Sequence, residues 1–457
     1  MKTKIGMLSL GCARNLVDAE VILGSLRRAG FAISEQVGDA DVAIVNTCCF
    51  IREAQEESID IILKLCRLKQ EGRIDKIVVC GCLVQRYKNE LVNEFKEVDA
   101  FVGVGSINKV TLVVKELLDG VKPLAPTSRG LRGRKTLGLF AQPQFLYTHS
   151  SPRVFLTPRH FAYIKISEGC DHCCSYCIIP RLRGRYRSRP MDSILKEVQG
   201  LLRQGVQELN LIGQDTTMYG QDLYGKGMLI RLLAGLSARA KGRWVRLLYA
   251  HPAHFSGELI AVIKNEPSIC KYVDLPIQHI NDTILKKMNR NTSRRHILSL
   301  IDRLRKEVPA LAIRTTLIVG FPGETDAQFK QLLNFIRQVR FERLGLFKYS
   351  RETETPAYDF VGQIPEKVKE VRYNQALSLQ QDISTEINER FLGKRLCVLI
   401  DGADEKDKNI FLGRSQADAP EVDGCVYVKS AKRLRPGDFV QVKIIDTLEY
   451  DLVGEAE

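Results

Sequence analysis

Three cysteines near the middle of the chain are spaced for iron–sulfur chemistry. Cys170, Cys174 and Cys177 form the pattern C-x3-C-x2-C within one loop. Three thiolates held this close together can bind three irons of a 4Fe–4S cluster. The fourth iron stays open, and it can chelate the amino and carboxylate groups of S-adenosylmethionine (SAM). An electron from the cluster then cleaves the sulfonium C–S bond and yields a 5′-deoxyadenosyl radical.

A zinc site is the alternative interpretation of the same loop. Two C-x2-C pairs can be drawn, Cys170 with Cys173 and Cys174 with Cys177. Structural zinc sites usually take their pairs from two separated loops, so two abutting pairs would enclose a tetrahedral ion poorly. The iron–sulfur interpretation is favoured, and Cys173 remains an extra thiol inside the motif.

A second set of three cysteines lies in the first part of the chain. Cys12, Cys48 and Cys82 each follow a predicted parallel strand. The carboxyl ends of such strands converge on one edge of an open sheet, so the three thiols should meet and could hold another 4Fe–4S cluster with an open iron. Any one of them alone would be a buried thiol. Cys49 and Cys80 are left out, because alternation along a strand points each away from the site.

The start of the chain does not resemble a secretion signal, and this bears on how the other cysteines are interpreted. The short apolar run Ile5–Leu10 is too short for a signal peptide, and no run of about 18 apolar residues predicts a membrane span. We therefore expect a cytoplasmic protein without disulfides, despite its 13 cysteines. Ordinary buried thiols are expected at Cys66, Cys270, Cys397 and Cys425.

The first 120 residues supply a βα repeat that can position the first cysteine set. Short apolar runs alternate with amphipathic stretches such as 51–68 and 110–118, which predicts an open parallel sheet. Residues 121–155 have weak periodicity and are predicted to be a linker or an extended loop. The predicted strands are Lys4–Leu10, Val42–Thr47, Lys76–Val79 and Phe101–Val104.

A second βα series begins near Phe161 and positions the central motif. Six units predict an open, partial (βα)6 barrel, because the closed form needs eight. Barrel chemistry sits at the carboxyl ends of the strands, where Cys170 follows the first of them. The predicted strands are Tyr163–Ile166, Glu208–Ile212, Val245–Tyr249, Tyr272–Leu275, Ile313–Val319 and Leu344–Tyr349.

The last part of the chain changes pattern. Pro365–Arg390 predicts one long polar helix, and short strands at Leu396–Ile400, Cys425–Val428 and Phe439–Ile445 predict a small all-β domain. The predicted fold class is α/β multidomain. Its domains are an N-terminal sheet at 1–120, a partial barrel at 156–388 and a small β-barrel at 389–457, with a linker at 121–155.

The formal charge of +14 is unevenly distributed. Residues 121–190 hold 13 Lys/Arg and two Asp/Glu, whereas residues 391–457 hold 10 Lys/Arg and 13 Asp/Glu. A domain that binds RNA is expected to be basic, so an acidic C-terminal end suits a basic protein partner. Free drift of surface charge is the alternative. The basic run Arg181–Arg189 could contact RNA, hold the SAM carboxylate or offset the negative charge of the clusters.

The central motif resembles that of the radical-SAM superfamily. The segment Thr316–Glu324 is similar to the superfamily segment that packs its backbone against the SAM adenine, and glycine there allows a close approach. Leu211–Asp215 ends a strand with polar groups that could reach a ribose or the substrate. Tyr176 could cover the cluster or the adenine, or simply pack. The candidate SAM contacts are Tyr176, Gln214, Asp215, Gly320, Pro322, Gly323 and Glu324.

Over nearly its whole length the chain resembles the methylthiotransferases. These join an N-terminal three-cysteine domain, a radical-SAM domain and a C-terminal TRAM β-barrel. The resemblance implies two 4Fe–4S clusters, the second of which holds the transferred sulfur. One SAM supplies the methyl group and another the radical, and a methylthio group replaces the hydrogen of an unactivated C–H bond. No catalytic residue is assigned beyond the cluster ligands.

One branch of this family modifies an adenosine in transfer RNA, and another modifies the β carbon of an aspartate in the small-subunit ribosomal protein twelve. Segments 9–20 and 413–424 resemble the second branch, as do 46–51 and 56–60. Cys49 and Cys173 depart from it. Glu421 and Asp423 could contact the substrate or shape a turn.

The resemblance also indicates partners and rival classes. The expected partners are the ribosomal protein, an electron donor such as flavodoxin or ferredoxin, and a ribosomal RNA contact. Transfer RNA is the alternative substrate. An iron–sulfur scaffold or RNA-binding module without catalysis is the alternative class of protein, which SAM cleavage by the protein would exclude.

Overall fold

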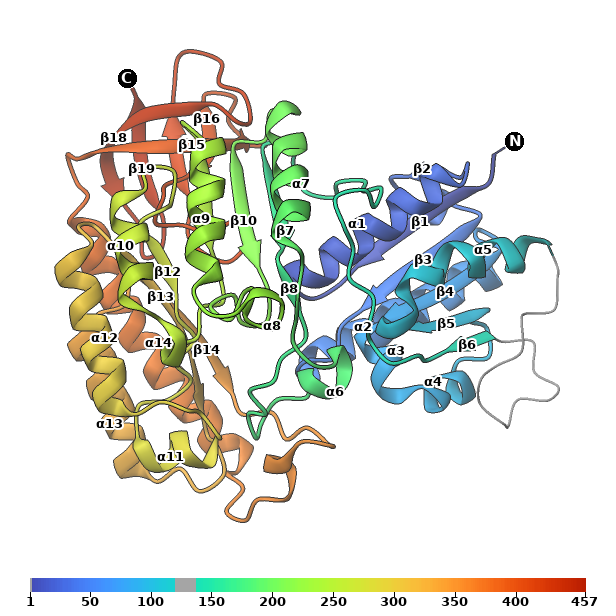
Figure 1. Cartoon of the computed structure of the whole chain (residues 1–457), viewed down its shortest axis with the longest axis horizontal. Helices are drawn as coiled ribbons and strands as arrows, with labels where there is room; N and C mark the ends of the chain where they lie inside the picture. Colours follow the sequence, from blue (N-terminus) through green and yellow to red (C-terminus); the bar gives the residue numbers. More distant parts are fainter. Residues whose placement is uncertain (1, 120–136) are drawn as a thin grey trace. The chain divides into compact units, whose positions relative to one another are not determined.

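The computed structural model describes residues 2–119 and 137–457, and its contacts divide the chain into two compact units (Figure 1). The first unit contains the N-terminal sheet, and the second contains the later βα series together with the C-terminal barrel. The first comprises residues 1–156, 168–171 and 177–189, and the second comprises 157–167, 172–176 and 190–457.

The first unit is built on a six-stranded sheet in which every pairing is parallel, in the order β2-β1-β3-β4-β5-β6. Its strands are β1 (Lys4–Ser9), β2 (Ala32–Ser34), β3 (Val42–Thr47), β4 (Lys76–Gly81), β5 (Ala100–Gly103) and β6 (Leu137–Leu139). Its helices are α1 (Ala13–Arg28), α2 (Arg52–Gln70), α3 (Cys82–Tyr87), α4 (Asn89–Glu94), α5 (Val110–Asp119) and α6 (Ile179–Arg183).

Both faces of this sheet are buried, which explains the continuous apolar runs in its sequence. Along β3, Ala43 and Val45 enter one hydrophobic cluster, whereas Val42 and Ile44 enter the other. Strands β2 and β6 escaped the sequence analysis, because three residues are too few to show a period. Strand β6 lies inside the predicted linker, which is therefore not loop throughout. The linker's residues 121–136 fall outside the described part of the chain.

The second unit contains six parallel strands in two three-stranded sheets, β11-β10-β7 and β12-β13-β14. Val245 of β11 pairs with Ile269, just before β12, and so links the two sheets. These are the six strands expected from the sequence, and the α/β fold class is confirmed. Their bounds are β7 (Phe161–Lys165), β10 (Glu208–Ile212), β11 (Trp244–Leu247), β12 (Tyr272–Asp274), β13 (Ala312–Val319) and β14 (Arg343–Lys348).

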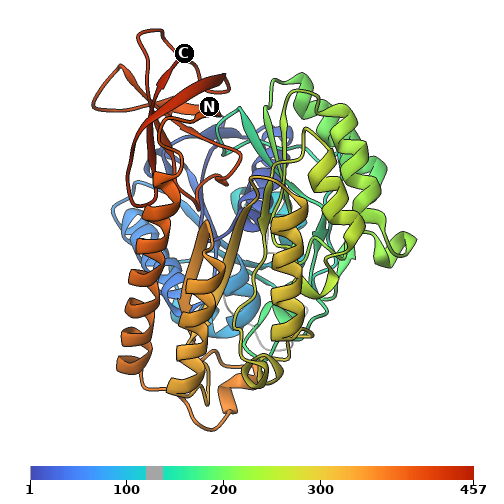
Figure 2. The same cartoon turned by 90° about the vertical axis from the view of Figure 1, so that its left-hand side faces the viewer.

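Helices follow these strands as a βα repeat requires. Helix α13 begins with a capping box, in which Thr325 and Gln328 satisfy each other's backbone N–H groups. The long helix expected near the end of the series is α14 (Glu366–Glu389), which leads into the barrel (Figure 2). The other helices include α7 (Met191–Arg203), α9 (Met228–Arg239), α10 (Gly257–Asn265), α12 (Arg294–Glu307) and α13 (Asp326–Val339).

The C-terminal domain is a closed barrel with the strand order β15-β16-β17-β19-β18. Its interior is aliphatic, with Val398, Ile400, Val426 and Val442 fully buried. Three of its strands were predicted from the sequence, whereas β16 and β19 were not. The strands are β15 (Arg395–Ala403), β16 (Ile410–Arg414), β17 (Val426–Lys429), β18 (Phe439–Thr447) and β19 (Leu452–Ala456).

Buried charges fix the barrel to the strands of the second unit. The carboxylate of Glu208, the first residue of β10, accepts hydrogen bonds from Arg246 Nε at 2.9 Å and from Arg414 Nη1 at 2.6 Å. Arg414 also donates two 2.8 Å bonds to Asp401. Glu208 is completely buried, so its two ion pairs are shielded from solvent.

Asp423 belongs to the same buried connection. Its carboxylate accepts hydrogen bonds from the Tyr272 hydroxyl at 2.7 Å and from Arg314 Nε at 3.2 Å, and its side chain is 2% exposed. Glu421 accepts a 2.8 Å bond from the Tyr163 hydroxyl. The hypothesis that Asp423 contacts a substrate is therefore wrong, because burial and these bonds give it the structural role.

Candidate active site

Cys12, Cys48 and Cys82 stand at the carboxyl ends of three neighbouring strands. Cys12 is the N-cap residue of α1 after β1, Cys48 follows β3, and Cys82 opens α3 after β4. Strands β1, β3 and β4 are adjacent in the sheet. The three thiols therefore lie along one edge of the first unit, where open sheets bind their ligands.

Two glycines allow the chain to come close at this edge. A methyl group on Gly11 would lie 2.7 Å from Sγ of Cys48, and one on Gly81 would lie 2.6 Å from the carbonyl oxygen of Thr47. Both glycines have positive φ, +86° and +102°, which side chains disfavour. The sequence Gly-Cys at 11–12 and 81–82 thus brings two cysteines of the set against the segment that carries the third.

Burial and neighbouring groups shift the pKa values of the three thiols. Burial raises the pKa of Cys48 to about 12, and the thiols of Cys82 and Cys12 add to that rise. Burial also raises the pKa of Cys82, which Arg183 opposes. For Cys12, burial is outweighed by Arg14 and Arg183, and its pKa lies below the ordinary value. Ligation to iron requires thiolates, so binding of a cluster here would release protons from these thiols.

The neighbouring cysteines point into the interior of the first unit. Cys49 belongs to the hydrophobic cluster on one face of the sheet and Cys80 to the cluster on the other face. Burial raises the pKa of Cys80. Both side chains are packed as ordinary core thiols. Cys66 and Cys270 are also buried.

The residues of the central motif are divided between the two units. Cys170 and Cys177 belong to the first unit and Cys174 to the second. In the first unit, the Cys170 N–H donates to the Gly184 carbonyl at 3.1 Å. In the second, the buried Cys174 thiol accepts a 3.7 Å contact from Arg290 Nη1. The donor chemistry of the motif fits iron, because three thiols follow one another on a short loop.

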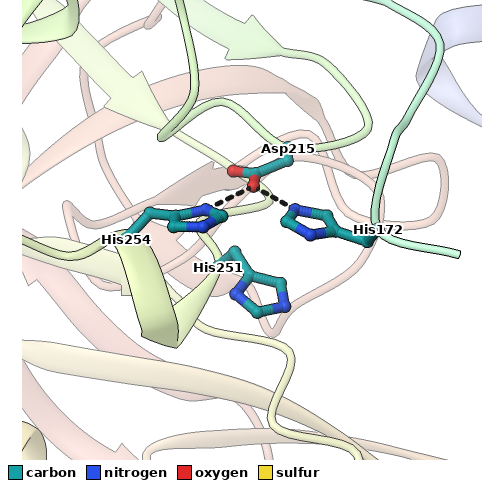
Figure 3. Close-up of side chains that lie close together, drawn as sticks. All are labelled: His172, Asp215, His251 and His254. Atoms are coloured by element: carbon teal, nitrogen blue, oxygen red, sulfur yellow. Dashed lines mark hydrogen bonds and ion pairs between the residues drawn. The ribbon is translucent and has the colours of Figure 1, made fainter. Parts of the chain in front are cut away.

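Two residues before Cys174, His172 takes part in a network of four side chains (Figure 3). His172 Nε2 lies 2.6 Å from Asp215 Oδ2, and His254 Nδ1 lies 3.1 Å from the same oxygen. The other carboxylate oxygen accepts the Thr217 N–H at 2.8 Å. Burial raises the pKa of Asp215, but the bonds from His172 and His254 outweigh it and hold the pKa well below its usual range.

His251 is the fourth side chain of the network, and its ring is not oriented to bind a metal ion together with His172. The four side chains offer donor atoms within 4.8 Å of one another, a set that suits a divalent transition metal. However, the rings of His172 and His251 stack, with centroids 4.3 Å apart and planes 18° apart. An ion lies in the plane of an imidazole that binds it, and one ion cannot lie in two stacked planes. His251 Nδ1 instead accepts the Ala253 N–H at 3.2 Å. The arrangement is thus a hydrogen-bonded network around Asp215.

Two segments assigned to SAM meet in the second unit. Tyr176 packs against the hydrophobic cluster that contains Phe321. The turn after β13 is held by Glu324, whose carboxylate accepts the N–H groups of Gly320 and Phe321. Gly320 and Gly323 have φ of +73° and +78°, so both use the left-handed region. Glu324 thus orders the backbone of this turn.

The remaining candidate contacts and the missed residues lie at the ends of barrel strands. Gln214 is half-buried after β10, and Pro322 is buried in the turn after β13. The histidines of the network were not predicted from the sequence. The available signal was the position of His251 and His254 directly after a predicted strand, where barrel enzymes place functional groups.

Comparison with protein families assigns all three parts of the chain. The Radical SAM superfamily model matches residues 164–336, the TRAM domain model matches 392–456, and the model of the Uncharacterized protein family UPF0004 matches 4–103. Two solved structures share the fold at low identity. They are the radical SAM methyltransferase TsrM from Kitasatospora setae (16% identity, TM-score 0.55, 86% of this chain and 76% of that one) and OxsB (12%, 0.52, 83% and 56%).

Fold and cysteine motif together define a radical-SAM enzyme with a TRAM barrel. Relatives named ribosomal protein uS12 methylthiotransferase RimO cover the whole chain. That of Heliobacterium modesticaldum is 47% identical over 99% of this chain and 95% of the relative, and that of Geobacter sulfurreducens is 46% identical over 99% and 98%. The chain belongs to this RimO family and is a transferase. No helix among the described residues is long and apolar enough to cross a membrane.

Proposed function

We propose that this enzyme inserts a methylthio group at the β carbon of an aspartate in ribosomal protein uS12. The observation that carries the proposal is the presence of two separate three-cysteine sets, one for radical formation and one for holding the transferred sulfur. Cys170, Cys174 and Cys177 match the set that generates radicals, and Cys12, Cys48 and Cys82 provide a separate set. The names of the full-length relatives support the substrate. Transfer RNA is the alternative substrate that the same chemistry would allow.

Each set would hold one 4Fe–4S cluster. At the first set, Gly11 leaves space beside Cys48 Sγ and Arg183 contacts Cys82 Sγ. At the second set, Arg290 Nη1 lies 3.7 Å from Cys174 Sγ. Three thiols with a cation nearby suit an anionic cluster. When bound, the two clusters and SAM supply the radical that opens an unactivated C–H bond and the methylthio group that replaces its hydrogen. The chain's own contribution is to hold the reacting groups and to exclude water.

SAM would lie over the carboxyl ends of the strands of the second unit. Gly320, Pro322 and Gly323 offer backbone there, and the Glu324 carboxylate fixes that backbone. Gln214 and Asp215 follow the carboxyl end of β10. Because Asp215 is already held by two histidines, it would position the loop of His172 as well as any ligand.

The barrel surface supports a contact with ribosomal RNA near the protein substrate. A groove of about 1030 Å³ on the barrel is lined by Lys408, Lys432, Arg433 and Arg435 and by no acidic side chain. Several acidic side chains of residues 391–457 form buried ion pairs with arginines, as Asp423 does with Arg314. The exposed surface of the domain is thus less acidic than its composition suggests, and a cationic groove suits phosphate groups.

Flavodoxin or ferredoxin is the expected electron donor, and the cytoplasm is the expected location.

Incubation of the purified enzyme with each substrate tests the proposal. Reconstituted protein receives SAM, sulfide and reductant together with either uS12 or unmodified transfer RNA. We expect the mass of uS12 to gain one methylthio group in place of a hydrogen, at an aspartate. Cys270→Ala, at a buried cysteine outside both sets, should retain this activity. Modification of an adenosine with uS12 untouched would contradict the proposal and favour the alternative.

A further inference from the structure

One guanidinium in the first unit is buried against the N-terminal cysteine set. The side chain of Arg183, at the end of α6, is 1% exposed. Its Nη2 donates to Asn15 Oδ1 at 3.0 Å and to Sγ of Cys82 at 3.4 Å. Its Nη1 faces Asp18 Oδ2 at 2.9 Å and Glu168 Oε1 at 3.1 Å. The two hydrogens of Nη2 are therefore divided between an amide oxygen and a cysteine sulfur.

The partners of this guanidinium come from both cysteine motifs. Asp18 lies in α1, whose N-cap residue is Cys12. Glu168 shortly precedes Cys170 in the sequence. The segment that carries Arg183 itself continues from the central motif. One side chain of the basic run 181–189 is thus committed to the interior of the first unit instead of a surface for RNA.

Arg183 remains a cation in this position. A guanidinium does not lose its proton in proteins, and this one donates to the carboxylates of Asp18 and Glu168. Two carboxylates are enough to pair a buried guanidinium. The contact with sulfur is additional to that pairing, and a purely structural ion pair would not require it.

We propose that Arg183 is a positioning residue that raises the reduction potential of the iron–sulfur cluster at Cys12, Cys48 and Cys82. The inference rests on the proposed function, which places a cluster there. Reduction adds negative charge to a cluster, and a cation with a hydrogen bond to a ligand sulfur stabilises the reduced form more than the oxidised form. Joining a carbon radical to a methylthiolate leaves one electron over. A cluster that is easier to reduce accepts that electron more readily.

Redox titration followed by electron paramagnetic resonance tests the inference. Full-length protein with Cys170, Cys174 and Cys177 changed to Ala isolates the N-terminal cluster. In this background, Arg183→Gln should shift the midpoint potential to more negative values, and Arg183→Lys should shift it less, because the charge remains. Arg153→Gln is the matched control. Arg153 is a buried arginine that pairs with the buried Glu20 of α1 at 2.6 Å in the same unit, so its loss should leave the potential unchanged.

Each outcome decides between the inference and its rivals. A shift for Arg183→Gln no larger than that of Arg153→Gln would overturn the inference. If Arg183→Gln does not fold, Asp18→Asn replaces it. That variant leaves Arg183 less neutralised and should shift the potential to more positive values, and an unchanged potential would overturn the inference. A background protein without any cluster would instead refute the proposed function, which separates the two failures.

Discussion

Replacing Arg414 with Met should loosen the attachment of the barrel. In the wild type, Glu208 is fully buried between Arg414 and Arg246, and Arg414 also binds Asp401 in a bidentate pair. Removal of one partner of a buried pair leaves a buried charge undercompensated, which costs about 3–5 kcal/mol. With an m-value of about 3 kcal/mol per molar urea, the unfolding midpoint should fall by about 1–2 M.

The only tryptophan of the chain reports this change directly. Trp244 of β11 packs edge-on against Phe439 of the barrel strand β18, with ring centroids 5.0 Å apart. Its fluorescence in a urea titration therefore follows the contact between barrel and βα strands. Arg395→Met is the control, because Arg395 forms an exposed pair with Glu457 on the same barrel. Such pairs contribute about 0–1 kcal/mol.

The destabilisation should also depend on pH. Burial raises the pKa of Glu208, but Arg414 and Arg246 outweigh it and lower the pKa in the folded state. A depressed pKa gives stability that is present above the unfolded value of about 4.3 and is lost as the pH falls through the folded value. The difference between wild type and Arg414→Met should be full at pH 7 and shrink below about pH 4. Equal midpoints for Arg414→Met and Arg395→Met at pH 7 would refute the reasoning.

Three further predictions concern the cysteine sites. Changing Cys12, Cys48 and Cys82 to Ala should leave about four irons and preserve SAM cleavage to deoxyadenosine, while no methylthio product forms; product at the wild-type level would remove this set from the reaction. Changing Cys170, Cys174 and Cys177 to Ala should abolish SAM cleavage, measured by chromatography of deoxyadenosine, and continued cleavage would show that the radical site lies elsewhere. Gly11→Ala should lose iron from the N-terminal site, since its methyl group would lie 2.7 Å from Cys48 Sγ. Gly30→Ala, with positive φ and open space, should keep its iron, and equal iron in both variants would contradict the packing argument.

The sequence was sufficient for the strands that carry the chemistry, because these are buried on both faces and long enough to show continuous apolar runs. Strand β3 was located at Val42–Thr47 with both ends correct. Contacts between distant segments could not be derived in the same way. The sequence around Asp423 does not indicate that its carboxylate accepts hydrogen bonds from Tyr272 and Arg314. A net charge likewise does not distinguish buried carboxylates from exposed ones. The negative net charge of residues 391–457 therefore gave no indication of the cationic groove on the barrel.

The network around Asp215 illustrates the same limit. His172 was visible inside the cysteine motif, but its partner follows a different strand, and only the fold brings the two within 2.6 Å. Arg183 was one of several arginines in a basic run with three open interpretations. Its burial, which sequence does not reveal, favours a role beside the cysteines of the first unit.

The intact mass of the small-subunit ribosomal proteins tests the central claim most directly. The proteins are compared between cells that contain this enzyme and cells that lack it, with a complemented strain as control. We predict that uS12 from cells with the enzyme is heavier by one methylthio group in place of a hydrogen, that fragmentation places the group on an aspartate, and that the mass falls back when Cys12 is changed to Ala. An identical mass of uS12 in the two strains, with a methylthio group lost from transfer RNA instead, would contradict the account.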